Sequence, residues 1–167
     1  MTKKYAFLLF LAAVALMAGC SRIKDDVIPA MPVGIDLTNI GIWSVYGVNG
    51  YGDYRYFNIE TGEPKGFPFT ATTFTGYGGL VIVCGYDFTT GDYNSILAYD
   101  MACPVERRKD VKKSINKEFK AGCKACGSTF DVCEGGGAPT SGKALDQKVG
   151  LSRYTASKSG GGYFIRR

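Results

Sequence analysis

Short apolar runs separated by glycine-containing turns dominate the chain from residue 33 onward. Residues 54–59 follow the period-2 pattern of a half-buried strand. Residues 79–84 and 95–99 are apolar arms on either side of a polar connection that contains Gly91, which predicts an antiparallel hairpin. Further strands are predicted at 35–48, 129–133 and 162–165.

The same region shows no apolar period of 3.6 residues that would indicate a helix. The chain contains 23 glycines, 11 tyrosines and 10 phenylalanines, a composition that favours strands and turns. We therefore predict an all-β fold, a small antiparallel sandwich or barrel spanning residues 33–167.

The N-terminus has a different pattern. Lys3 and Lys4 precede an uninterrupted apolar run from Tyr5 to Met17. At about 1.5 Å per residue, a helix of this length falls short of the roughly 30 Å hydrocarbon core of a membrane. Residues 1–19 are therefore interpreted as a signal peptide.

Small residues lead directly to the first cysteine, in the sequence Met17-Ala18-Gly19-Cys20. This sequence resembles the lipobox of bacterial lipoproteins, which implies cleavage before Cys20 and attachment of lipid to its thiol. Two or three acyl chains anchor a protein stably, so a lipidated Cys20 would bind the membrane without a transmembrane helix.

Residues 20–32 are predicted to form the lipidated tether. Within them, Lys24-Asp25-Asp26 resembles the lipoprotein export signal of one group of Gram-negative bacteria, which implies an outer membrane lipoprotein displayed on the cell surface. The alternative is a polar spacer on a protein that faces the periplasm.

The formal net charge of +5 is too small and too dispersed to indicate a nucleic-acid partner. The densest basic stretch, residues 107–113, has no accompanying basic helical face or aromatic stacking motif, and we interpret it as a solvated loop. Tyrosines among glycine and asparagine leave a glycan or an envelope protein open as a partner, although tyrosines are also ordinary in antiparallel sheets. They are Tyr46, Tyr51, Tyr54, Tyr56 and Tyr77.

Five cysteines remain after Cys20, an odd number that cannot all pair within one domain. Cys123 and Cys126 form a CxxC motif, which suits either a tetrahedral metal ion or an exported disulfide. The spacing does not decide between a metal, a disulfide and reduced thiols. Cys84 and Cys133 lie in apolar strand contexts, where free thiols are commonly buried.

Cys103-Pro104, the run from Cys123 to Asp131 and the glycine-rich segment 135–144 follow one another in a recognisable order. Together they resemble the C-terminal half of a Rieske iron–sulfur domain, and the resemblance extends from about residue 79 to residue 165. It implies a Rieske-like sandwich or barrel with a cysteine-bearing loop subdomain, in which the Cys103 turn meets the Cys123–Cys126 turn.

The chain departs from the Rieske pattern at the ligands. Val105 and Cys126 stand where the resemblance places the two cluster histidines, and the sequence contains no histidine. A histidine-ligated Rieske cluster therefore cannot form. The resemblance is closer to Rieske-like bacterial surface lipoproteins that lack these histidines.

The remaining cofactor candidates are Zn, or an all-cysteine Fe–S cluster of low potential. The predicted ligands are Cys103, Cys123, Cys126 and, as the fourth, Cys133 or another donor. A metal would hold the sulfurs about 3.5–4 Å apart, whereas a disulfide would bring one pair to about 2.05 Å.

We expect a membrane-anchored lipoprotein with a non-enzymatic binding or structural role. A metal-binding electron-transfer protein that uses three or four of the cysteines is the alternative. A thiol-disulfide enzyme using Cys123 and Cys126 is a third hypothesis, although the βαβ context typical of thioredoxin-like enzymes is missing.

Overall fold

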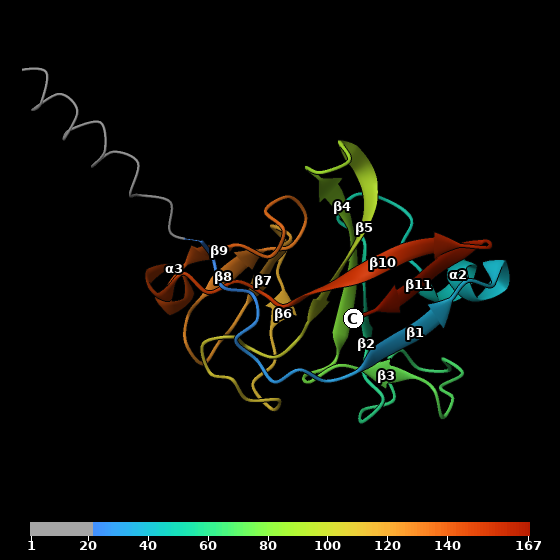
Figure 1. Ribbon diagram of the computed structural model, residues 1–167, viewed down its shortest axis with the longest axis horizontal. Helices are drawn as coiled ribbons and strands as arrows, with labels where there is room; N and C mark the ends of the chain where they lie inside the picture. The colour runs from blue at the N-terminus through green and yellow to red at the C-terminus, as the bar shows by residue number, and fades with distance from the viewer. Residues whose placement is uncertain (1–21) are drawn as a thin grey trace, which may run out of the picture.

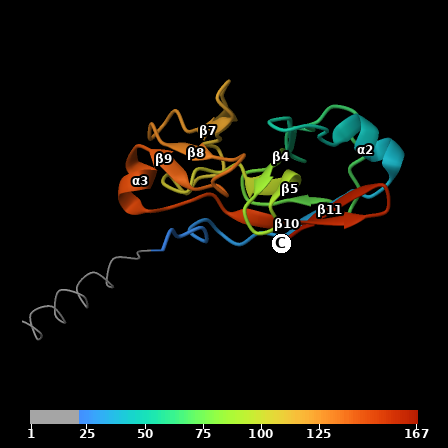
Figure 2. The ribbon, with the colours of Figure 1, turned by 90° about the horizontal axis from the view of Figure 1, so that it is seen from above.

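A computed structural model describes residues 22–167 and arranges them in two antiparallel sheets that lie side by side (Figure 1, Figure 2). The strands of the larger sheet are β1 (Val33–Leu37), β2 (Tyr54–Phe57), β3 (Phe74–Thr75), β4 (Leu80–Asp87), β5 (Asp92–Asp100), β10 (Arg153–Ser159) and β11 (Gly162–Arg166). The strands of the smaller sheet are β6 (Ser114–Ile115), β7 (Lys120–Gly122), β8 (Thr129–Asp131) and β9 (Pro139–Ser141).

Within the described residues the larger sheet has seven strands in the order β2-β4-β5-β10-β11-β1-β3 and curls into a nearly closed barrel. The smaller sheet, β6-β7-β8-β9, is inserted between β5 and β10. The prediction of an all-β antiparallel fold is therefore confirmed. The predicted signal peptide, residues 1–19, and Cys20 lie outside the described residues.

The β4–β5 hairpin is the centre of the fold, and its prediction is confirmed with Ile82 opposite Ala98. Leu80 and Ile82 belong to the core inside the barrel, whereas Val81 and Val83 belong to a second core between the barrel and the smaller sheet. Both faces of β4 are therefore covered, which explains an unbroken apolar run in a strand of an antiparallel sheet.

The prediction of strands throughout residues 35–48 is wrong beyond β1. Residues Ile40–Tyr46 form helix α2, capped by Asn39, whose side chain accepts hydrogen bonds from the amides of Gly41 and Ile42. The apolar side chains of α2 cover part of the barrel core. A helix of seven residues is too short for its period to be separated from strand alternation.

A second short helix, α3 (Lys143–Gln147), follows β9 and covers one end of the smaller sheet (Figure 1). Its Ala144 is fully buried, and the Ala144 amide donates a hydrogen bond to Ser128 Oγ at 2.9 Å. This contact connects the helix to the loop that carries the CxxC motif. The sequence showed no apolar period that would indicate this helix, because α3 has only five residues.

The segment before β1 packs on the domain from Lys24 onward. The Lys24 amide donates to Lys148 O at 2.9 Å, and Lys24 O accepts from the Gly150 amide at 2.7 Å. Ile28 is buried, whereas the side chains of residues 24–26 are exposed. Part of the predicted tether therefore belongs to the folded domain. In residues 22–167, no helix combines the length and the apolarity that crossing a membrane requires.

Candidate metal centre

Two loops of the smaller-sheet region bring three cysteines together. Cys103 follows the end of β5, and Cys123 and Cys126 lie in the turn between β7 and β8. The three Sγ atoms all lie within 4.8 Å of one another, and Cys103 Sγ is 3.6 Å from Cys126 Sγ. The prediction that these sulfurs lie close together, although about 20 residues separate Cys103 from Cys123, is therefore confirmed.

Hydrogen-bonded turns fix the direction of both loops. The Arg107 amide donates to Cys103 O at 2.8 Å, and the Gly127 amide donates to Cys123 O at 2.9 Å. Gly127 has a φ of 69°, a left-handed conformation that glycine adopts without steric cost. The glycine after the CxxC motif therefore allows the chain to reverse directly after Cys126.

Ser128 connects the CxxC turn to the rest of the domain. It is fully buried, and its Oγ lies 3.2 Å from Cys126 Sγ while accepting the Ala144 amide. The Cys126 thiol donates to this hydroxyl oxygen, which has a lone pair for each of its two donors, and the hydroxyl can donate to the sulfur once the thiol has lost its proton. Ser128 therefore restrains Cys126 and can stabilise its thiolate.

The thiols differ in acidity. Burial raises the pKa of Cys103 to about 12. Burial acts in the same direction on Cys126, but hydrogen bonds from Ser128, then from Cys103 and Cys123, outweigh it and lower the pKa of Cys126. Cys126 is also the more exposed of the two. Of these two thiols, Cys126 is therefore the one that loses its proton first.

A buried lysine lies beside the thiols. Lys113 is only 3% exposed, and its Nζ donates to Asp100 O at 2.9 Å and to Ala102 O. It also lies 5.9 Å from the centre of the Phe130 ring. Burial lowers the pKa of Lys113 to about 8, opposed by the charge of Asp100 and by the nearby thiols. The interpretation of residues 107–113 as a solvated loop is therefore wrong for Lys113.

A buried carboxylate fixes the backbone that leads to Cys103. Asp100 is fully buried and accepts hydrogen bonds from the amides of Tyr77, Gly78 and Ala102 and from Tyr154 Oη, at 2.7–3.0 Å. The Ala102 amide is one residue before Cys103. Asp100 therefore fixes the backbone conformation after the end of β5.

Cys133, the predicted fourth ligand, does not join the three clustered thiols. Its carbonyl accepts the Tyr86 amide at 2.7 Å, which places it against β4. Cys84 packs in the barrel core, and Cys133 packs in the second core. All five cysteines within residues 22–167 are free.

Sequence reasoning did not identify Ser128, Lys113 or Asp100 as parts of this region. Asp100 carried one usable signal, a carboxylate directly after the apolar arm of a predicted strand. Lys113 carried none, because it ends a basic stretch, residues 107–113, whose composition is that of a solvated loop. Ser128 belongs to the run from Cys123 to Asp131 that carries the family resemblance, but the resemblance assigns it no role.

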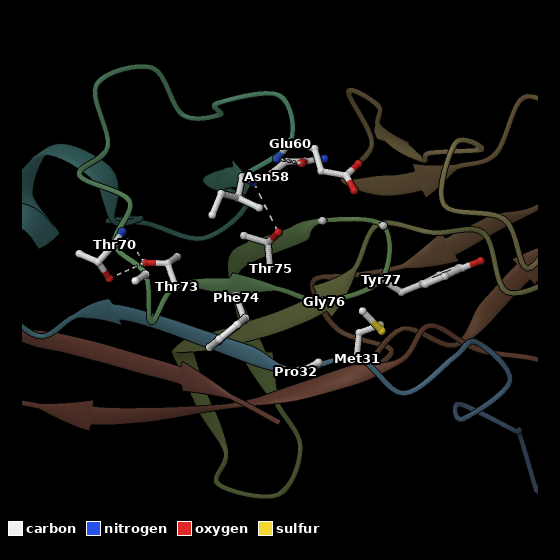
Figure 3. Close-up of a pocket in the computed structure, with 14 residues that line it drawn as sticks. Met31, Pro32, Asn58, Glu60, Thr70, Thr73, Phe74, Thr75, Gly76 and Tyr77 are labelled. Atoms are coloured by element: carbon white, nitrogen blue, oxygen red, sulfur yellow. Dashed lines mark hydrogen bonds between the residues drawn. The ribbon is translucent and has the colours of Figure 1, made fainter.

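A separate cavity of about 340 Å³ lies beside the edge strand β3 (Figure 3). Its lining includes the hydroxyls of Thr70 and Thr73, which hydrogen-bond each other at 3.1 Å, and the rings of Phe74 and Tyr77. Of the tyrosines that suggested a glycan contact, Tyr77 lines this cavity, whereas the four between residues 46 and 56 do not. Tyr46, for example, donates its hydroxyl to Gly66 O.

The chain matches no family model, and no curated protein or solved structure matches it. The chemistry of the site is therefore inferred from its own geometry.

Proposed function

We propose that this protein is a lipid-anchored envelope lipoprotein that binds one thiophilic metal ion between Cys103, Cys123 and Cys126, in a non-enzymatic role. The observation that carries the metal part is the convergence of three Sγ atoms within 4.8 Å. Zn–S bonds of about 2.3 Å at tetrahedral angles place two sulfurs about 3.7 Å apart. The Cys103–Cys126 separation of 3.6 Å has that size.

A single ion suits this arrangement better than an iron–sulfur cluster. An all-cysteine Fe–S cluster takes four thiolates. Among residues 22–167 three thiols converge, and Cys84 and Cys133 lie elsewhere. The histidine-ligated Rieske cluster does not fit either, since the chain contains no histidine and Val105 packs against the second core. The fourth position of a tetrahedral ion would fall to water or to an external ligand.

The rest of the proposal comes from the sequence. The lipobox sequence before Cys20 supports the membrane anchor. The exposed side chains of residues 24–26 support the export signal, because an export factor can reach them. The Rieske-like fold is part of the proposal, and the meeting of the Cys103 turn with the CxxC turn supports it.

The metal proposal is tested by titrating Co²⁺ into protein purified under reducing, anaerobic conditions. We expect one equivalent to bind with a thiolate-to-metal charge-transfer band, and Zn²⁺ to displace it. Cys103→Ala, Cys123→Ala and Cys126→Ala should each weaken binding strongly. Cys84→Ala is the matched control, because it also removes a buried thiol but one outside the cluster.

Two results would contradict the proposal. One is a wild-type protein that binds no stoichiometric Co²⁺ or Zn²⁺ while all three thiols are shown to be reduced. The other is a loss of binding in Cys84→Ala as large as that in Cys103→Ala, because general destabilisation would then explain both.

A further inference from the structure

Lys113 lies between the two loops that carry the thiols. Its Nζ donates to Ala102 O, the carbonyl directly before Cys103, and faces the ring of Phe130 on β8, the strand that follows the CxxC turn. Phe130 pairs with Ala121, two residues before Cys123. The ammonium group is therefore fixed to the backbone of one thiol loop and borders the strands of the other.

No carboxylate makes an ion pair with Lys113 within the described residues. The nearest acidic residue in its hydrogen-bond network is Asp100, but Lys113 binds the main-chain carbonyl of Asp100. The Asp100 carboxylate accepts three amides and the hydroxyl of Tyr154 instead. A buried cation without a contacting anion is costly. Two carbonyls, one ring face and the charge of the non-contacting Asp100 carboxylate offset only part of that cost, because burial still lowers the pKa of Lys113.

We propose that Lys113 is the counter-charge of the three-thiolate site and determines its preference for ions that form anionic complexes. This inference rests on the metal binding proposed above. A divalent ion that replaces the protons of Cys103, Cys123 and Cys126 brings two positive charges and releases three protons. The site then carries one net negative charge, which the ammonium of Lys113 balances.

The same three thiols can take a ligand that leaves no net charge. Arsenous acid, As(OH)₃, reacts with three thiols to give a neutral arsenic trithiolate and three molecules of water, with no change in oxidation state. Because that complex is neutral, the positive charge of Lys113 does not stabilise it. Cd²⁺ and arsenite therefore bind the same sulfurs, but only the affinity for Cd²⁺ includes an electrostatic contribution from Lys113.

The experiment measures the affinity of the purified, reduced protein for Cd²⁺ and for arsenite. The variants are Lys113→Met, which keeps the apolar stem, and Lys113→Gln, which keeps a donor for the two carbonyls. Lys112→Met is the matched control, because it removes an exposed charge from the adjacent residue. Arsenite binding also verifies that the three-thiol site of each variant is intact.

We expect both Lys113 variants to bind Cd²⁺ roughly tenfold more weakly or worse, as loss of a nearby unit charge at low dielectric implies. Arsenite affinity should change by less than about twofold, the size of an ordinary surface effect. Lys112→Met should leave both affinities unchanged.

Two outcomes would overturn the role of Lys113. Unchanged Cd²⁺ affinity in both variants would show that its charge does not act on the site. Equal weakening of Cd²⁺ and arsenite binding would show that Lys113 only shapes the loops. A wild-type protein that binds neither probe would instead refute the proposed metal site itself.

Discussion

Replacing Tyr154 with phenylalanine should destabilise the domain by about 2 kcal/mol. The Tyr154 hydroxyl donates to Asp100 Oδ2 at 2.7 Å, and both residues are buried, with Tyr154 5% exposed and Asp100 fully enclosed. A hydrogen bond to a charged group contributes about 1.5–3 kcal/mol. The three backbone amides that also bind Asp100 remain in the variant, so the carboxylate keeps most of its partners.

The loss should depend on pH. Burial, then the charge and the hydrogen bond of Asp100, raise the pKa of Tyr154 above its usual value. The unfolded chain ionises this phenol near pH 10, while the folded protein keeps the proton. The stability that Tyr154 contributes is therefore complete below pH 10 and decreases as the pH rises above it. The difference between wild type and Tyr154→Phe should shrink accordingly.

Urea unfolding monitored by circular dichroism measures both effects, with Tyr93→Phe as the matched control. Tyr93 is 64% exposed, so loss of its hydroxyl should change stability by less than about 0.5 kcal/mol. If Tyr154→Phe behaves like Tyr93→Phe at neutral pH, the Asp100 network does not hold the end of β5 as described. A domain stability of about 5–15 kcal/mol leaves room to measure the difference.

Iodoacetamide should modify Cys126 before Cys103 and Cys133, because burial raises the pKa of the last two to about 12. Peptide mass spectrometry measures the order, and equal rates at Cys126 and Cys133 would contradict it. Cys20→Ser should abolish lipidation, shown by the mass of the protein and by its loss from the membrane fraction; unchanged retention in membranes would refute the lipobox. Alanine at residues 24–26 should reduce cleavage by external protease on intact cells, while the purified protein keeps its stability, since these side chains are exposed. Equal cleavage before and after the change would refute the export signal.

The local sequence pattern determined several strands of this protein. Alternation and turn residues predicted the β4–β5 hairpin and strands β2, β8 and β11, because side-chain direction in a strand follows sequence position directly. The resemblance in the cysteine segment also placed Cys103 with Cys123 and Cys126, as the structure does.

Other features depended on contacts between distant segments. Residues 40–46 are helical because Asn39 caps them and the barrel core receives their apolar face, although their local pattern equally suits a strand. The chain makes Cys133 a plausible ligand, but its packing against β4 removes it from the three clustered thiols.

Lys113 shows the limit of local reasoning most clearly. Residues 107–110 and Lys112 are exposed, whereas Lys113 is enclosed by contacts with the carbonyls of Asp100 and Ala102 and with the ring of Phe130. Burial is a property of the assembled fold, since it depends on which distant side chains exclude water from a group. The sequence by itself therefore determined which residues can bind a metal, and the tertiary structure decided which of them meet and what charge surrounds them.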